Sequence, residues 1–272
     1  MLKESFILNN GISIPKLALG TWQVPNDVAI TAVKDALSVG YRHIDTASAY
    51  QNETGVGIAI KESNIPRSEI FVTSKVPAEI KSYVEAKDFI DGSLSKLNVD
   101  YIDLMLIHAP KPWDEMVSGS TKAYFEENLA VWRALEEAYI EGKLKAIGVS
   151  NFEVNDLQNI IENGTIKPQA NQIRVHIGHV PTDVIRYCED NDILVQAFSP
   201  NATGRLIGTE SIEAMAKKYN VTIPQLAIRF DLQLGLLPIP KTTHKEYMIS
   251  NSEVDFTIAD EDMEILMKVP EI

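Results

Sequence analysis

Short apolar runs alternate with longer stretches of helical periodicity along nearly the whole chain. Such alternation is typical of βαβ units, in which the strands pair in parallel. The runs that we assign as strands lie at residues 17–19, 43–44, 70–73, 102–107, 146–149, 170–173, 194–197 and 237–239. Each of them except the last is followed by a segment that predicts a helix. The order of elements therefore predicts a parallel sheet of eight strands.

Two further segments have a clear helical period. In residues 124–139, apolar side chains recur at helical spacing, which predicts a helix with one buried face. These side chains are Leu129, Trp132, Leu135 and Ala138. Residues 260–268 predict an acidic C-terminal helix with one solvated face.

The N-terminal segment has the pattern of a β-hairpin. Residues 6–8 and 12–14 are separated by Asn9, Asn10 and Gly11. A tight hairpin turn needs positive φ values, which Asn10 and Gly11 can adopt. We expect an antiparallel hairpin here that plugs the floor of a barrel.

The length of 272 residues is typical of one α/β barrel. No Pro-, Gly- or Ser-rich linker and no low-complexity tract divides the chain. We therefore predict the α/β class and a single (β/α)8 TIM-barrel domain over residues 1–272, with the N-terminal β-hairpin as its plug. Residues 109–122 form the longest stretch without a clear pattern, and a loop of that length is usually functional.

One glycine run has a superficial likeness to a dinucleotide-binding fingerprint. Gly55 and Gly57 have the spacing of its first two glycines, but Ile60 stands where the third belongs. The run lies within a helical pattern and does not directly follow a predicted strand, as the fingerprint requires. We therefore reject a Rossmann fold.

Charge and composition exclude several classes of partner. The formal net charge of −13 disfavours nucleic acid and anionic lipid, and no apolar run approaches the ~20 residues of a membrane span. The first ten residues lack the apolar run of a signal peptide, and Cys188 is the only cysteine. We expect a cytoplasmic monomer that binds neither nucleic acid nor membrane.

His176 and His179 have a spacing seen in metal sites, but no further ligand accompanies them, so we expect no metal.

Four reactive side chains follow three neighbouring predicted strands. Asp45, Tyr50, Lys75 and His108 stand at or just past strand ends, where barrel enzymes carry their active sites. A lysine cation beside a tyrosine favours the phenolate, so we expect Lys75 to lower the pKa of Tyr50 toward neutrality. Asp45 would keep Lys75 charged, and His108 would hydrogen-bond a substrate carbonyl.

Motifs in the same order along nearly the whole chain resemble those of the aldo-keto reductases. They are GYRHIDTA at 40–47, TSKV at 73–76, LIHAP at 106–110, GVSNF at 148–152, NQ at 171–172, AFSP at 197–200 and IPKTT at 239–243. The resemblance implies NADPH-dependent reduction of small aldehydes and ketones. It also implies that Asp45, Tyr50, Lys75 and His108 are catalytic, that Tyr50 protonates the carbonyl oxygen as hydride reaches the carbon, and that no metal takes part.

The resemblance also implies a set of cofactor contacts. Ser150, Asn151 and Gln172 match the positions that bind the nicotinamide carboxamide, and Thr21 is assigned to the same site. Phe198 stands where a tyrosine stacks on the nicotinamide in the family, and its ring keeps that face. Ser199 matches a pyrophosphate contact.

A basic and hydroxyl-bearing cluster follows the eighth predicted strand, where barrels often bind phosphate. It contains Lys241, Thr242, His244 and Lys245. The resemblance places the adenosine 2′-phosphate of NADPH there and an adenine contact at Asn251. Tyr247 replaces the family's usual arginine and Ser250 its glutamate, so NADPH is the expected cofactor and NADH stays possible.

Substrate contacts are assigned to Tyr50, His108, Trp22 and Trp113. Trp22 matches the family's pocket-wall tryptophan, and Trp113 stands in the long loop after the fourth strand.

Two rival functions remain open. One is a lyase that uses Lys75 as a Schiff-base nucleophile, which a charged lysine disfavours. The other is a sensor or regulatory subunit that binds the cofactor without turnover.

Overall fold

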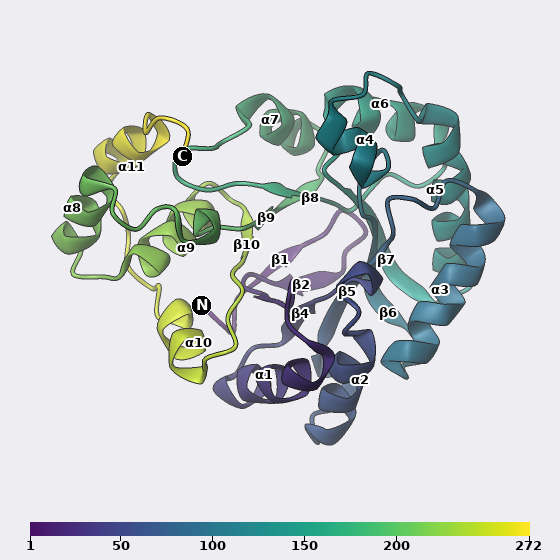
Figure 1. Ribbon diagram of the computed structural model, residues 1–272, viewed down its shortest axis with the longest axis horizontal. Coiled ribbons are helices and arrows are strands. Elements are labelled where there is room, and N and C mark those ends of the chain that lie inside the picture. The colour runs from purple at the N-terminus through teal and green to yellow at the C-terminus, as the bar shows by residue number, and fades with distance from the viewer.

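The computed structural model describes all 272 residues, and its main feature is a sheet of eight parallel strands in sequential order. The strands are β3 (Leu19–Gly20), β4 (His43–Asp45), β5 (Phe71–Val76), β6 (Ile102–Ile107), β7 (Leu144–Ser150), β8 (Ala170–Arg174), β9 (Leu194–Phe198) and β10 (Leu237–Ile239). The two edges meet because the amide of Gly20 donates to the carbonyl of Pro240 at 3.0 Å. The sheet thus closes into the predicted (β/α)8 TIM barrel, whose strands ring the centre in Figure 1.

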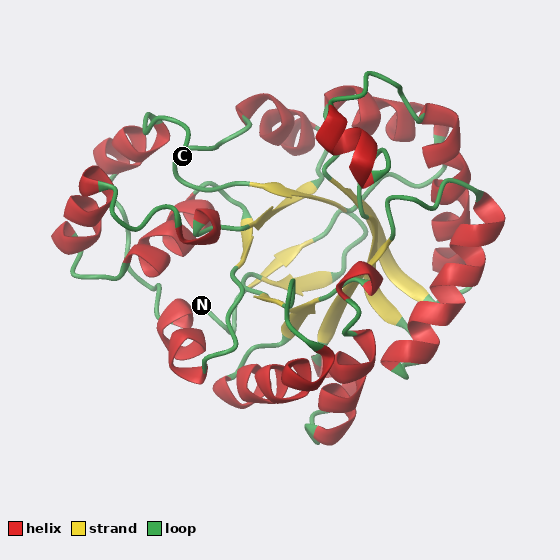
Figure 2. Cartoon of the chain, viewed as in Figure 1, coloured by secondary structure: helices red, strands yellow, loops and turns green.

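Helices surround this ring on the outside (Figure 2). They are α1 (Asn26–Val39), α2 (Glu53–Glu62), α3 (Tyr83–Leu97), α4 (Trp113–Ser118), α5 (Phe125–Ile140), α6 (Val154–Asn163), α7 (Thr182–Asp190), α8 (Glu210–Lys218), α9 (Ile223–Gln233), α10 (Lys245–Ser252) and α11 (Asp260–Met267). The predicted helix at 124–139 is confirmed as α5, and Trp132 on its inner face is fully buried. The largest apolar cluster lies between this helical layer and the strands.

The N-terminal hairpin fills the barrel, as predicted. Its strands β1 (Ser5–Ile7) and β2 (Ser13–Pro15) pair antiparallel and lie inside the ring of strands in Figure 1. Leu8 and Ile14 belong to one buried cluster with inward-facing strand residues such as Leu104. The hairpin therefore stabilises the barrel by burying apolar surface in its interior.

The turn of the hairpin differs from the prediction in one respect. Only Gly11 adopts a positive φ, of 84°, because its amide closes a turn on the carbonyl of Leu8. Asn10 keeps a negative φ and uses its side chain instead, which donates to the carbonyl of Lys145 and accepts from the amide of Ile12.

Several predicted boundaries were wrong. The first barrel strand lies at Leu19–Gly20 rather than 17–19, and β5 extends to Val76, so that Lys75 lies within a strand. The stretch 109–122 is not structureless, because α4 forms inside it. The last strand is followed by α10 as well as by α11, so the helical alternation continues to the end of the barrel.

The glycines of α2 have a packing role. A Cβ atom on Gly55 would lie 2.1 Å from the carbonyl oxygen of Asn26, and one on Gly57 would lie 2.2 Å from that of Leu97. Gly55 therefore allows α2 to approach the start of α1, and Gly57 the end of α3. The fold thus confirms the rejection of a Rossmann fingerprint.

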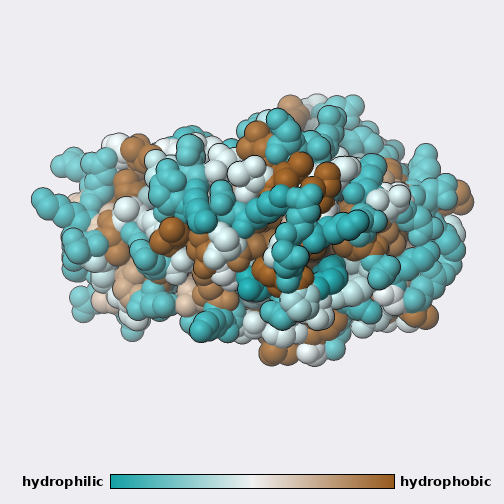
Figure 3. Space-filling model, turned by 90° about the horizontal axis from the view of Figure 1, so that it is seen from below, coloured by the Kyte–Doolittle hydropathy of each residue, from teal (hydrophilic) through white to brown (hydrophobic).

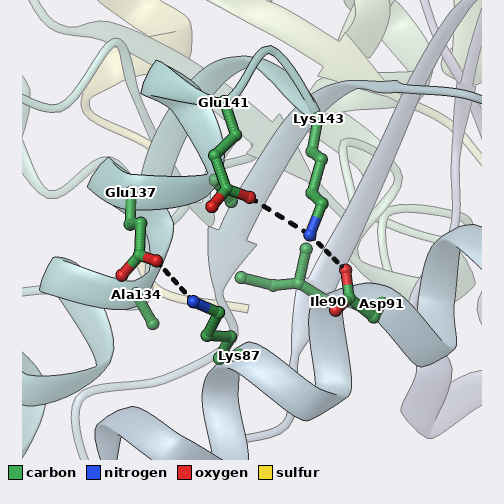
Figure 4. Close-up of a pocket in the computed structure, with 8 residues that line it drawn as sticks. Lys87, Ile90, Asp91, Ala134, Glu137, Glu141 and Lys143 are labelled. Carbon is green, nitrogen blue, oxygen red and sulfur yellow. Dashed lines mark hydrogen bonds and ion pairs between the residues drawn. The ribbon is translucent and has the colours of Figure 1, made fainter.

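The face of the molecule displayed in Figure 3 is predominantly polar. Figure 3 shows apolar residues scattered among hydrophilic ones on the face that it displays. On the outside of the barrel, ion pairs join α3 to α5 and to the turn that follows α5, around a small pocket (Figure 4). Lys143 contacts Asp91 at 2.7 Å and Glu141 at 3.1 Å, and Lys87 pairs with Glu137. No helix is long and apolar enough to cross a membrane.

Candidate active site

The four predicted catalytic side chains come from three adjacent strands of the barrel. Asp45 is the last residue of β4, Lys75 lies near the end of β5, and His108 directly follows β6. Tyr50 ends a short 3-10 helix, η1 (Ser48–Tyr50), which follows β4. The carboxyl ends of parallel strands meet at one rim, so the fold brings all four side chains together there.

The ammonium group of Lys75 is the centre of this arrangement. Its Nζ donates to Oδ1 of Asp45 at 2.7 Å, to the carbonyl of Thr46 at 2.9 Å and to the hydroxyl oxygen of Tyr50 at 3.3 Å. An ammonium has three hydrogens, and all three are used. Because the Tyr50 oxygen accepts from Lys75, its own hydrogen is free to point elsewhere.

Burial controls the ionisation of Tyr50. It raises the Tyr50 pKa more than the charge of Lys75 lowers it, so the pKa lies above its usual value of 10.0. The prediction that Lys75 brings this pKa toward neutrality was therefore wrong, because it omitted the cost of desolvating a phenolate. Burial also lowers the Lys75 pKa, but Asp45 and Tyr50 raise it by more, so Lys75 stays charged.

His108 is held as a neutral imidazole. Burial, with a smaller contribution from the charge of Lys75, lowers its pKa to about 3. Its ring meets Tyr50 edge-on at 5.7 Å between centroids and Trp113 at 5.2 Å. Its Nδ1 has no partner within the protein. A neutral ring has one N–H donor, which suits a hydrogen bond to an uncharged carbonyl.

Gln172 is tied to the catalytic carboxylate. Its Nε2 donates to Oδ2 of Asp45 at 2.7 Å and to Oε1 of Gln196 at 2.8 Å. Sequence reasoning placed Gln172 only at the cofactor and missed Gln196. The available signal was a single polar residue within the otherwise apolar strand β9.

Asn52 is a second residue that sequence reasoning missed. It is fully buried, and its Nδ2 donates to the carbonyls of Thr21 and Val24 at 2.9 Å each. Its Oδ1 accepts from the hydroxyl of Thr46 at 2.6 Å. Asn52 thus joins the loop that carries Trp22, which is 46% exposed, to the segment that leads to Tyr50.

The residues assigned to the nicotinamide lie on β7, β8 and β9. Ser150 ends β7, and its hydroxyl donates to the carbonyl of Gln172 at 2.8 Å. Asn151 follows with a φ of 59°, and its Nδ2 donates to the carbonyl of His108 and to Ser150 Oγ at 3.0 Å each. Phe198 ends β9, and Ser199 turns the chain with a φ of 55°. These residues therefore occupy the same rim as the four catalytic candidates.

The basic cluster follows β10. Lys241 forms a bridge beside Gly20, next to Thr21, and has no ion pair or side-chain hydrogen bond. By contrast, Nζ of Lys245 forms an ion pair with Oδ1 of Asp35 at 3.5 Å. Lys241 is therefore the cation of this cluster that is most available to an anion.

Helix α10 begins directly after this cluster. Its N-cap, His244, makes no side-chain capping bond, so the amides of Lys245 and Glu246 are available to an anion, whereas the Tyr247 amide donates to the His244 carbonyl. Thr242 and Asn251 are buried, whereas Tyr247 is 57% exposed and lies edge-on to His244 at 5.3 Å.

The remaining titratable residues singled out from the sequence lie outside this rim or form no ligand set. His176 and His179 face each other across a tight turn, and no cluster of three or more metal-binding side chains exists in the structure. His43 is fully buried against Phe71 and has a packing role. Cys188 is buried, and burial raises its pKa to about 11, which makes it unreactive.

A closed parallel barrel with Asp, Tyr, Lys and His at the carboxyl ends of its strands has the architecture of a barrel enzyme with its active site at this rim. The chain belongs to the aldo/keto reductase family, whose model matches residues 16–271. It is 40% identical to a glyoxal reductase of Bacillus subtilis over 265 residues, which cover 97% of this chain and 91% of that protein. It is 35% identical to a glycerol 2-dehydrogenase (NADP(+)) of Saccharomyces cerevisiae over 281 residues, covering 96% and 89% of the two chains.

Solved structures agree with this assignment. An aldo-keto reductase from a Medee basin deep-sea metagenome library superposes with a TM-score of 0.91 at 41% identity, covering 98% of this chain and 95% of the other. An aldo-keto reductase of Bombyx mori in complex with NADP has a TM-score of 0.88 at 32% identity and covers 98% and 93%. The protein is therefore an oxidoreductase that reduces small carbonyl compounds with a nicotinamide cofactor.

Proposed function

We propose that this protein reduces aldehydes and ketones to alcohols with NADPH and that Tyr50 donates the proton. The observation that carries the proposal is the hydrogen bond from Lys75 Nζ to the Tyr50 oxygen, at 3.3 Å. This bond makes the phenol an acceptor toward Lys75 and leaves its hydrogen for a substrate oxygen. It also stabilises the phenolate that remains after the proton has left.

His108 and Lys75, the two neighbours of Tyr50, have separate roles in the reaction. His108, neutral because of burial, donates its N–H to the carbonyl oxygen and so orients and polarises it. The charge of Lys75 is fixed by Asp45, whose carboxylate lies 2.7 Å away in a site closed to water. When bound, the reduced nicotinamide supplies the hydride to the carbonyl carbon. The only group that the protein itself transfers to the substrate is the proton of Tyr50.

The rim fits the nicotinamide end of the cofactor. Gln172 uses both hydrogens of its Nε2 within the protein, whereas its Oε1 has no protein partner and can accept from the carboxamide. Ser150 and Asn151 would hold the same carboxamide, and Phe198 offers a ring face on which the nicotinamide would stack. Ser199 would contact the pyrophosphate, and Thr21, buried with its hydroxyl donating to the carbonyl of Asp45 at 2.9 Å, would lie beside the nicotinamide end.

The cluster after β10 supports NADPH over NADH. Lys241 has no ion pair, and the amides of Lys245 and Glu246 at the start of α10 are uncapped, so both kinds of group can meet a 2′-phosphate. Thr242 and Tyr247 would add hydroxyl contacts, and Asn251 would contact the adenine. Because Tyr247 stands where the family usually has a bidentate arginine, we propose NADPH as the preferred cofactor, held by Lys241, and NADH as a weaker one.

The substrate would lie between Tyr50 and two aromatic side chains. Trp113 packs edge-on against His108, and Trp22 is partly exposed near the same rim. Aromatic walls with a few polar groups suit small carbonyl compounds of varied shape. We therefore propose methylglyoxal, phenylglyoxal and aromatic aldehydes as the class to test first.

The contacts of Lys75 disfavour the rival lyase. A Schiff-base lysine must be neutral to attack, yet all three hydrogens of Lys75 are donated and its pKa is raised by Asp45 and Tyr50 despite burial. The rival sensor would need the cofactor contacts but no proton donor. The hydrogen of Tyr50 that is free to reach a substrate oxygen therefore favours an enzyme over a sensor.

The deciding experiment follows the absorbance of NADPH and NADH, separately, with the purified protein and each of the three carbonyl types. Turnover with faster use of NADPH is the expected result. Tight binding of cofactor without turnover on any carbonyl would favour the sensor. Labelling of Lys75 by borohydride in the presence of a carbonyl would favour the lyase.

A further inference from the structure

Gln196 makes a buried contact that the catalytic scheme does not use. It lies on β9 directly in register with Gln172 on β8, so the two side chains project to the same side of the sheet. Its Oε1 accepts from Gln172 Nε2 at 2.8 Å, and its own Nε2 is buried without any partner.

The chemistry of Asp45 determines how both amides are oriented. A carboxylate paired with the Lys75 ammonium can only accept, so Gln172 must direct its NH2 group, not its oxygen, toward Asp45. The second hydrogen of that NH2 group then needs an acceptor, which is Oε1 of Gln196. The nitrogen of Gln196 is consequently turned away from Gln172.

This orientation leaves a cost at Gln196. A buried NH2 group without an acceptor destabilises the fold, because it has lost its hydrogen bonds to water and gained none in the protein. Methionine has a similar length and would avoid that cost. The contribution of glutamine at position 196 is therefore its oxygen atom rather than its packing.

Two acceptors hold the amide of Gln172 in one plane. Asp45 alone would allow either hydrogen of the NH2 group to face it, and the amide plane could then rotate. With Gln196 as the second acceptor, each hydrogen of the NH2 group has its own acceptor. The amide plane of Gln172 is then fixed, and its Oε1 points in a single direction. This oxygen is the atom to which we assign the cofactor carboxamide.

We propose that Gln196 is a positioning residue that fixes Gln172 Oε1 as the acceptor for the N–H of the nicotinamide carboxamide. The inference rests on the proposed function. Its consequence is selectivity for a cofactor that carries a carboxamide N–H. An analogue with a 3-acetyl group keeps the carbonyl and loses both N–H donors of the carboxamide, so it reports on the hydrogen bonds that this NH2 group donates, and the position-196 variants isolate the one to Gln172.

The test compares the dissociation constants of NADP⁺ and its 3-acetylpyridine analogue by quenching of tryptophan fluorescence. The wild-type protein is expected to bind NADP⁺ about three- to tenfold more tightly, as one hydrogen bond would provide. Gln196→Met is expected to bring this ratio close to one, with a melting temperature near that of the wild type, because the unpartnered NH2 group of Gln196 is removed while one hydrogen of Gln172 Nε2 loses its acceptor.

Gln169→Met is the matched control, because Gln169 is a buried glutamine of the same barrel that bonds only to backbone groups. It is expected to lower stability and to keep the ratio. Gln196→Glu restores an acceptor at the same place and is expected to recover part of the ratio. In a Gln172→Met background, Gln196→Met should change the ratio no further.

An unchanged ratio in a folded Gln196→Met variant would overturn the proposal. Equal binding of both cofactors by the wild type would also overturn it, while leaving carbonyl turnover and the role of Tyr50 intact. Failure of the wild type to bind either cofactor would overturn the proposed function as well. The outcomes for the two proposals are thus distinguishable.

Discussion

Lys75 Nζ lies 3.3 Å from the hydroxyl oxygen of Tyr50 and donates a hydrogen bond to it. The same nitrogen is held by Asp45, so the direction of the contact is fixed by a buried ion pair. A phenol that accepts from a lysine presents its own hydrogen outward. Tyr50 is therefore placed as a general acid that can protonate a carbonyl oxygen.

Tyr50→Phe is expected to lower kcat for carbonyl reduction by about 10²- to 10⁴-fold, because it removes the proton donor and keeps the ring. The dissociation constant for NADPH should change less than about twofold, since Tyr50 is assigned to the substrate side. Steady-state kinetics and fluorescence titration measure the two quantities. Tyr101→Phe is the control, because the Tyr101 hydroxyl has no hydrogen bond within the protein. Near-normal turnover by Tyr50→Phe would refute the mechanism.

The pH dependence of kcat for reduction follows from two groups. Reduction needs Tyr50 protonated, and burial raises its pKa above 10.0, so activity is lost only as pH rises through that raised pKa. His108 has a pKa of about 3 and stays neutral above it. We expect kcat to be constant between about pH 5.5 and 9. An inflection near pH 6.5 that disappears in His108→Gln would show that His108 titrates, contrary to its burial.

Lys241→Ala is expected to weaken NADPH binding by about tenfold or more and to leave NADH binding nearly unchanged, because only NADPH carries the 2′-phosphate. Titrating both cofactors at two salt concentrations measures this difference, and higher salt should reduce it. Lys61→Ala is the matched control, since Lys61 is an exposed lysine of α2 without an ion pair. Equal losses for the two cofactors would refute the phosphate assignment.

The sequence was sufficient for the parts of the fold that depend on periodicity and order. Eight β-rich runs alternating with helices required a parallel sheet, and reactive residues at strand ends had to share one rim. Asp45 and Lys75 could therefore be paired without coordinates. The boundaries were less accurate where a strand is only two residues long, as in β3, or where it continues into a catalytic residue, as in β5.

The remaining properties of the site depend on three-dimensional burial and register. The Tyr50 pKa was predicted in the wrong direction because the proximity of Lys75 is visible in a motif, whereas the loss of water around the ring is not. Gln196 was missed because its partner Gln172 is 24 residues away, and only the pairing of β8 with β9 brings them together. Asn52 bonds mostly to backbone carbonyls, which no sequence pattern identifies.

Asp231 provides a prediction about stability that is independent of the active site. This carboxyl lies on α9, is fully buried, and neither of its oxygens has a partner. Burial raises its pKa well above the usual value. The folded protein therefore holds a proton that the unfolded chain releases above about pH 3.9. The contribution of Asp231 is fully favourable below that pH and is lost as pH rises through the folded-state pKa.

Asp231→Asn removes the ionisation and exchanges an unpartnered buried carboxyl for an unpartnered buried amide of the same shape, so the lost ionisation should dominate and raise the melting temperature at pH 7–8. A gain of about 1 kcal/mol corresponds to about 2–4 °C for a protein of this size. Because the wild-type penalty disappears in acid, the gain should shrink toward zero as pH falls toward 4. Thermal unfolding by circular dichroism from pH 4 to 8 measures it, with Asp88→Asn, at an exposed aspartate of α3, as the control. A gain that is the same at every pH would mean that Asp231→Asn relieves a steric or hydrogen-bonding defect rather than the cost of burying an ionisable group.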